Sequence, residues 1–163
     1  MAGAFLEDRA PGMRVTTAGT HVVEGMPMSW RTRDAIAEFG AVRTMHRSHQ
    51  LTDADVAAAD VVICLAAEHV GYMRRTHPDA AGKTVTLRRL VGDLPSAPGE
   101  SFAERLAALN LADVELDPVE DVADPAGGDL PVFSACAHEI HELIDVLVRE
   151  LGEETPPREQ EIA

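Results

Sequence analysis

The sequence has little cysteine, little positive charge and no long apolar run. Its 163 residues include two cysteines, Cys64 and Cys136, too few for a disulfide framework, so a reducing cytoplasm is the expected location. No stretch approaches the roughly 20 apolar residues that cross a bilayer, and the N-terminus does not have the order of a signal peptide. The net charge of −14 disfavours nucleic acid and anionic membranes as partners.

Several catalytic motifs are also absent. The sequence contains no phosphate-binding G-x-x-x-x-G-K-[ST], no G-x-G-x-x-G and no G-x-S-x-G, so neither a nucleotide cofactor nor a serine hydrolase is indicated. A Cys-x5-Arg phosphate loop needs an arginine six positions after its cysteine, but Val70 follows Cys64 and Glu142 follows Cys136 at that spacing. Both cysteines fall in apolar patterns, which favours core packing over a nucleophilic role.

The composition is typical of one globular domain. Hydrophobic residues make up 45% of the chain and charged residues 26%. We expect a single domain over residues 1–151, followed by a flexible acidic tail over 152–163, where GEETPPREQEIA ends the sequence.

Strands and helices are expected to alternate along this domain. The apolar run VVICLA at 61–66 indicates a strand buried on both faces of a parallel sheet, and further strands are predicted over 14–18 and from 84, the latter continuing as strand or helix to 91. Helices are predicted over 2–9, 29–39, 68–76, 101–111 and 133–151, with a Thr52-capped turn or short helix after 52 and a loop over 115–133. This order predicts an α/β fold with an open sheet.

Two histidines near the C-terminus raise the possibility of a metal site. His138 and His141 lie three residues apart on the last predicted helix, with Glu142 beside them. The H-E-x-x-H metal motif needs histidines four residues apart, so this spacing favours a solvated helix face. A metal-dependent hydrolase that uses His138 and His141 stays a minor alternative.

The loop DVADPAGGD at 121–129 allows two interpretations. Asp121 and Asp124 flank a turn, Pro125 fixes the backbone after Asp124, and Gly127 with Gly128 allows a close approach. The loop is either an acidic turn before a helix or the support of a carboxylic acid that donates a proton over a pocket.

Six motifs in order resemble the low molecular weight protein-tyrosine-phosphatase family. They are T-A-G-T-H, G-M-P-M, H-R-S-H-Q-L-T, A-D-V-V-I-C-L-A-A-E-H, D-V-A-D-P-A-G-G and an apolar C-terminal helix. The resemblance runs from residue 1 to about residue 151 and is strongest to the actinobacterial branch, whose chemistry overlaps with arsenate reductases. It implies a three-layer sandwich with helices on both faces of a parallel sheet, and hydrolysis of phosphotyrosine or a similar phosphomonoester through a cysteinyl-phosphate.

The resemblance also implies residue roles. Asp124 matches the family's general acid, and Thr17 and His46 match positions that support the phosphate loop. The expected partners are a phosphorylated protein or a small phosphomonoester.

Positions in the expected substrate cleft depart from the family pattern. His21, Val22 and Ala126 are implied as cleft residues, but none supplies the aromatic ring that usually lines a phosphotyrosine cleft. Ser48 and His49 replace the usual Ala-Arg of the H-x-A-R-Q motif. A preference for phosphotyrosine is therefore an open question.

The resemblance places the Cys-x5-Arg loop and the first strand before residue 1, since Met1-Ala2 matches the family's Met-Ala that follows the loop. In the family's strand order that first strand lies between 14–18 and 61–66, so without it these two segments cannot pair. We therefore predict that the 163-residue chain is inactive as a thiolate phosphatase. A noncatalytic pseudophosphatase that binds a partner is the alternative.

Overall fold

The computed structural model describes residues 1–41 and 45–152, and the tail predicted over 152–163 lies outside them except for Gly152. The described residues form α1 (Ala2–Arg9), α2 (Trp30–Ala37), α3 (Asp53–Ala58), β1 (Val62–Cys64), α4 (Ala67–Thr76), the 3₁₀ helix η1 (Pro78–Lys83), β2 (Thr84–Thr86), α5 (Leu87–Asp93), η2 (Leu94–Ser96), α6 (Phe102–Ala108), η3 (Pro118–Glu120) and α7 (Leu130–Gly152).

The sheet of the described residues consists of β1 and β2, which run parallel. Val62 pairs with Thr84, Ile63 with Val85 and Cys64 with Thr86, and α4 and η1 connect the two strands. The run predicted as strand over 84–91 thus changes to helix at Leu87, where Thr86 caps α5 by accepting a hydrogen bond from Arg89 N.

The strand predicted over 14–18 does not form. These residues are mostly exposed and make no ladder, and the nearest pairing is an isolated parallel bridge between Gly19 and Gln50. As the sequence argument expects, 14–18 does not pair with β1. A strand needs a hydrogen-bonded neighbour, and the described part of the chain offers none to this segment.

β1 is less buried than the sequence predicts. Cys64 is buried, but Val62 and Ile63 are half-buried, because β1 is bonded along its β2 edge alone within the described residues. The prediction that the whole run is buried on both faces is therefore wrong.

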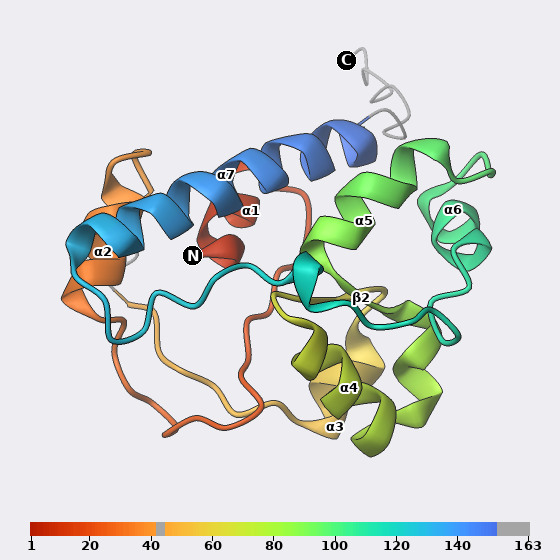
Figure 1. The fold of residues 1–163 in the computed structure, drawn as a ribbon, viewed down its shortest axis with the longest axis horizontal. Coiled ribbons are helices and arrows are strands. Elements are labelled where there is room, and N and C mark those ends of the chain that lie inside the picture. The colour runs from red at the N-terminus through yellow and green to blue at the C-terminus, as the bar shows by residue number, and fades with distance from the viewer. Residues whose placement is uncertain (42–44, 153–163) are drawn as a thin grey trace, which may run out of the picture.

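Helices cover both faces of this open sheet, as the predicted α/β class requires (Figure 1). The long helix α7 packs across α1, α2 and α5 on one side, while α4 contacts β1 and β2 on the other. The larger apolar cluster lies under α7 and includes Phe5, Ile36, Leu87, Leu90, Ile140 and Ile144, and the smaller one comprises Val56, Cys64, Val70, Met73 and Ala80.

Helix boundaries follow local chemistry. As the sequence predicts, Ser29 caps α2 by accepting a hydrogen bond from Thr32 N, and Thr52 caps α3, where Asp55 completes a capping box. Helix α7 begins at Leu130, inside the predicted loop, where Asp129 Oδ1 accepts from Val132 N at 3.4 Å.

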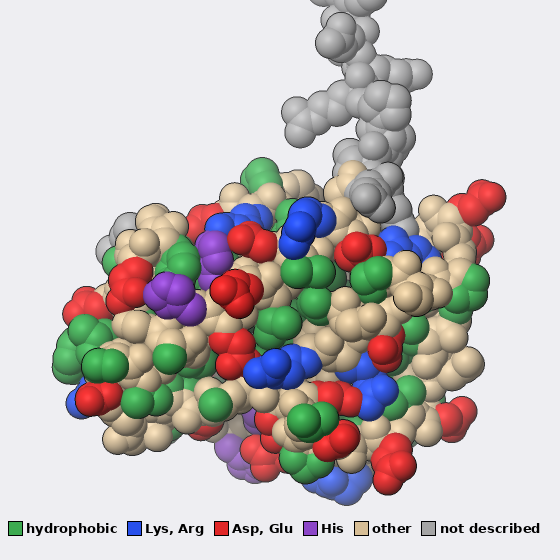
Figure 2. Space-filling model, turned by 45° about the horizontal axis from the view of Figure 1, so that its top comes forward, with side chains coloured by type: hydrophobic (Ala, Val, Ile, Leu, Met, Phe, Trp, Pro, Cys, Tyr) green, Lys and Arg blue, Asp and Glu red, His purple; other side chains and the backbone are tan. Residues whose placement is uncertain are grey.

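The surface carries charge of both signs. The face that bears α7 shows acidic side chains scattered among basic ones and histidines, without one broad basic area (Figure 2). No helix in the described ranges is long and apolar enough to cross a membrane.

Candidate functional site

A cavity of about 260 Å³ lies between the start of the chain and two loops. Its walls come from the start of the chain with α1, from the segment 17–28 and from the loop before α3, namely Met1, Gly3, Ala4, Glu7, Thr17, Ala18, Gly19, Val22, Met28, His46, Ser48 and His49. The fold thus brings together Thr17, Val22 and His46, three of the residues that the sequence implies for the site.

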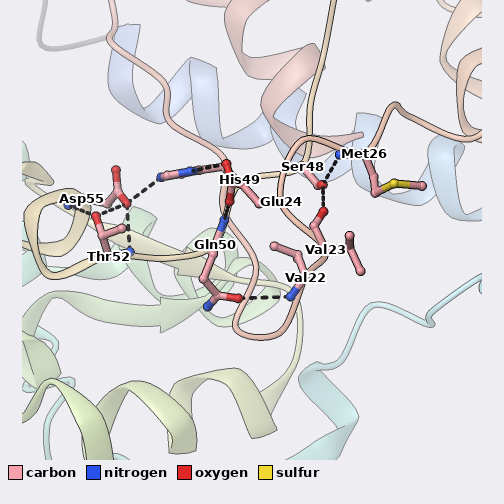
Figure 3. A network of polar contacts seen from close by, with 9 residues as sticks. All are labelled: Val22, Val23, Glu24, Met26, Ser48, His49, Gln50, Thr52 and Asp55. Atoms are coloured by element: carbon pink, nitrogen blue, oxygen red, sulfur yellow. Dashed lines mark hydrogen bonds and ion pairs between the residues drawn. The ribbon is translucent and has the colours of Figure 1, made fainter.

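The segment 20–28, which contributes Val22, is held by the loop over 46–50. Both ends of the Gln50 side-chain amide bind this segment. Its Oε1 accepts from Val22 N at 3.1 Å (Figure 3), and its Nε2 donates to Thr20 O at 2.9 Å. Ser48 N donates to Met26 O at 2.8 Å, and Ser48 Oγ accepts from Met26 N at 2.9 Å.

His49 lies between two carboxylates at this junction (Figure 3). Its Nε2 is 2.9 Å from Asp55 Oδ2 on α3, and its Nδ1 is 3.3 Å from Glu24 Oε1. Hydrogen bonds to Asp55 and then to Glu24 raise the pKa of His49.

The pKa values of the two carboxylates shift in the opposite direction to that of His49. The pKa of Glu24 is lowered, chiefly by the hydrogen bond that its Oε2 accepts from Gln50 N at 2.6 Å. The pKa of Asp55 is lowered, chiefly by the Thr52 hydroxyl and then by His49. From the sequence, His49 is a departure from a family motif, but Glu24 and Asp55 have no predicted role, because nothing in their spacing shows that they meet.

His21 does not line the cavity. Its ring lies edge-on to Tyr72 of α4, with 6.0 Å between ring centroids. The implied cleft residue therefore faces α4, while its neighbour Val22 lines the cavity.

The loop that carries Asp124 is anchored where β1 ends. Val122 N donates to Leu65 O at 2.8 Å, and Asp121 Oδ1 accepts from Ala67 N, in the first turn of α4, at 2.6 Å. Beyond these anchors Asp124 is exposed, and its Oδ1 accepts from Ala126 N at 2.9 Å, an Asx turn. The loop is thus fixed at Asp121 and Val122 and presents the Asp124 carboxylate to solvent.

Helix α5 fastens the same loop from the side. Arg88 Nε donates to Asp121 O at 3.3 Å, and Arg89 forms an ion pair with Glu120. The Glu120 carboxylate also accepts a hydrogen bond from Thr86 Oγ1 at 2.6 Å.

Asp124 lies within electrostatic range of Cys136 on α7. Burial raises the pKa of the Cys136 thiol, the carboxylates of Glu139 and Asp124 raise it further, and the amino group of Met1 opposes them. Met1 lines the cavity, whereas neither Asp124 nor Ala126 does.

Both cysteines are free and buried, which confirms the core-packing interpretation. Burial raises the pKa of Cys64 to about 12. A thiol of that kind stays protonated at neutral pH and is a poor nucleophile.

The two histidines of α7 have protein partners. The ring of His141 stacks on Phe39, with 4.2 Å between centroids, and its two nitrogens face Arg9 and Asp145. His138 Nδ1 lies 2.9 Å from Ser134 O. No group of three or more His, Cys, Asp or Glu side chains in the described ranges is placed to hold a metal ion.

Comparison with known proteins gives consistent similarities. The model of the family described as low molecular weight phosphotyrosine protein phosphatase matches residues 1–98. The chain is 29% identical to a protein-arginine-phosphatase of Geobacillus stearothermophilus over 155 residues, which is 94% of this chain and 88% of that protein. It is also 29% identical to EpsP of Ralstonia solanacearum, a probable low molecular weight protein-tyrosine-phosphatase, over 87 residues.

These alignments cover different shares of the two chains compared. The EpsP alignment spans 53% of this chain and 60% of that protein, so it falls short of two thirds of EpsP. The solved structure of the YwlE arginine phosphatase from Geobacillus stearothermophilus superposes with a TM-score of 0.73 at 28% identity, covering 94% of this chain and 84% of that one.

Proposed function

We propose that this chain, which belongs to the low molecular weight phosphotyrosine protein phosphatase family, supplies the general acid and a cleft wall of a phosphatase that works through a cysteinyl-phosphate. The observation that supports the proposal is the placement of Asp124, an exposed carboxylate on a loop anchored at the carboxyl end of β1. Ligands of open α/β sheets bind at this end of the strands.

Asp124 has the features that the acid needs. In its protonated form it would donate a proton to the leaving oxygen as the bond to phosphorus breaks. As a carboxylate it would then accept a proton from the water that attacks the cysteinyl-phosphate. Its exposure leaves it open to a leaving group, and the contact with Ala126 N holds its orientation. Thr17 and His46, which share the cavity beside α1, are assigned the support of the phosphate loop.

The 163-residue chain by itself is proposed to have no thiolate turnover. Neither Cys64 nor Cys136 is followed by arginine six positions on, and burial disfavours both thiolates. The lack of a suitable nucleophile among Cys64 and Cys136 also favours the second candidate, a noncatalytic binding protein with the family fold. For either candidate function, the proposed location of the chain is the cytoplasm, where two unpaired cysteines are stable.

The proposed substrate is a phosphorylated protein side chain or a small phosphomonoester. Ala126 beside the acid is exposed and small, and Val22 is the cleft-wall residue that lines the cavity. A relative named as a protein-arginine-phosphatase aligns over most of the chain, so phosphoarginine is a substrate class to compare with phosphotyrosine.

The test is a chimera that carries a family strand and Cys-x5-Arg loop fused before Met1. We expect the chimera to hydrolyse p-nitrophenyl phosphate and the 163-residue chain to show none of this turnover. Asp124→Asn in the chimera should lower kcat for phosphotyrosyl or phosphoarginyl peptides by about 10²–10⁴.

Asp117→Asn is the matched control. Asp117 Oδ1 accepts from Val119 N at 2.9 Å, the same local contact that Asp124 makes with Ala126 N, and it lies in the same loop. Equal losses of kcat in the two variants would contradict the role of Asp124 as the acid. Turnover by the unfused 163-residue chain would overturn the proposal that this chain has no nucleophile.

A further inference from the structure

His49 joins two segments that are far apart in the sequence. Glu24 lies in a turn of the segment 20–28, and Asp55 lies in the first turn of α3. Each ring nitrogen of His49 is within 3.3 Å of a carboxylate oxygen, and within the described residues no other histidine, lysine or arginine lies within ion-pair distance of either carboxylate.

Only one protonation state satisfies both contacts. A neutral imidazole has one N–H, so its second nitrogen would turn a lone pair toward a carboxylate oxygen. The imidazolium has two N–H donors, one for Asp55 and one for Glu24. The arrangement is therefore complete only when His49 is charged.

We propose that His49 is a protonation-dependent clamp: as imidazolium it holds the segment 20–28 against the N-terminus of α3, and on losing a proton it releases the Glu24 side of that contact. The two sides are unequal. Asp55 is held independently, since its Oδ2 also accepts from Thr52 N at 2.9 Å and from the Thr52 hydroxyl. Glu24 lies in an exposed turn, is farther from the ring at 3.3 Å against 2.9 Å, and has one further contact, from Gln50 N, so it is the side that moves.

The clamp acts on the cavity wall. Val22 lines the cavity two residues before Glu24, and the Glu24 carboxylate accepts from Gln50 N at 2.6 Å, next to His49. Opening the clamp loosens this turn and with it the wall that Val22 forms. The clamp itself follows from the contacts alone, and only its meaning for substrate entry rests on the proposed function.

The charged surroundings favour the closed state. Glu24 faces His49 from the segment 20–28, Asp55 faces it from α3, and Glu7 of α1 and His46 line the same cavity. The pKa of His49 is raised by the two carboxylates, in agreement with the geometry. The clamp is therefore closed in mild acid and opens as the pH rises through the raised pKa of His49.

The test is amide hydrogen exchange of the 163-residue protein, measured by NMR from about pH 5.5 to 8.5 and corrected for intrinsic rates. The reporters are Gly25 N, bonded to Ser48 O at 2.9 Å, and Gln50 N, bonded to Glu24. We expect their protection factors to fall several-fold through the titration of the His49 ring, observed in the same sample.

Two variants at position 49 separate clamping from packing. His49→Arg supplies a permanent cation, so protection at Gly25 and Gln50 should become independent of pH and stay high. His49→Gln has no charge, so protection should be low at every pH. His77→Gln is the matched control, because His77 contacts one carboxylate of α3, Asp53 at 3.4 Å, outside the cavity, and it should behave as wild type.

A variant of the partner carboxylate keeps the proposal testable if the His49 variants unfold. Glu24→Gln removes one exposed carboxylate and should lower the midpoint of His49 by about 0.5 pH unit or more. A midpoint unchanged by Glu24→Gln, or wild-type protection factors that do not change through the titration, would overturn the clamp. No substrate is used, so neither result bears on the role of Asp124.

Discussion

The loop over 117–126 and the segment over 20–28 carry the proposed acid and a proposed cleft wall, yet they are held by different kinds of contact. The first is anchored on β1 and α4 through the backbone of Val122 and the side chain of Asp121. The second is held against another loop, through side chains such as Gln50 and His49.

The difference shows which part of the site responds to pH. The acid loop is held through the backbone N–H groups of Val122 and Ala67, which carry no titratable proton, so it keeps its place as the pH changes near neutrality. The segment 20–28 is held in part by His49, an ionisable group whose pKa is raised by hydrogen bonds to Asp55 and then to Glu24. A change of pH should therefore alter the wall of the cleft and leave the position of the acid unchanged.

The largest expected effect comes from breaking the anchor of the acid loop. Asp121→Ala leaves Ala67 N without its acceptor at the start of α4 and should lower the free energy of unfolding by about 1–3 kcal/mol, measured by urea denaturation. Asp124→Ala is the control, since Asp124 is exposed, and it should change stability by less than about 0.5 kcal/mol. Equal effects would show that Asp121 is not the anchor.

The second expected effect is a pH dependence of the unfolding free energy that arises from the segment 20–28 and its contact with His49. The pKa of His49 is raised in the folded state, so its stabilising contribution is complete below the unfolded value of about 6.5 and is lost as pH rises through the folded value. The lowered pKa values of Glu24 and Asp55 act at the acid end, where their contribution is lost as pH falls through their folded values. Urea unfolding of wild type and His49→Gln over a pH series measures the difference.

That difference in unfolding free energy should be largest in mild acid and should shrink above neutrality. The matched comparison is Asp121→Ala, whose deficit relative to wild type should stay nearly constant between about pH 6 and 8. A difference between wild type and His49→Gln that grows with pH would contradict the assigned sign.

The smallest effect is on thiol labelling. At a pKa of about 12, the thiolate of Cys64 is about 10⁻⁴ of the population at pH 8, so it should react far more slowly than an exposed cysteine. Cys136 lies near the acid loop, so Asp121→Ala should raise its labelling several-fold while His49→Gln should not. Peptide mass spectrometry after iodoacetamide treatment identifies each site, and an equal rise in both variants would erase the contrast between the two regions.

Local signals predicted most of the helices and the family motifs. Ser29 and Thr52 cap their helices because a side-chain oxygen close in sequence satisfies a free N–H, which needs no information about the rest of the fold. The apolar stripe through Ile140 and Ile144 is buried for a similarly local reason, since residues at this spacing share one helix face.

Signals that need a partner strand were less reliable. Residues 14–18 have the composition of a strand, but a strand depends on hydrogen bonds to a neighbour, and none of the described residues pairs with them. The run that contains Val62 and Ile63 was expected to be fully buried, and it is half-buried because β2 bonds one of its edges. Sequence pattern sets the tendency of a segment, and its neighbours set the outcome.

The sequence by itself determined the α/β class, the helix caps and the buried character of both cysteines, while the role of Asp124 as the acid stays a prediction. The tertiary structure alone decided that His49 meets both Glu24 and Asp55, and that Asp124 stands on a loop anchored to the end of β1. Capping and periodicity act over a few residues, whereas contacts between distant segments exist only once the chain has packed.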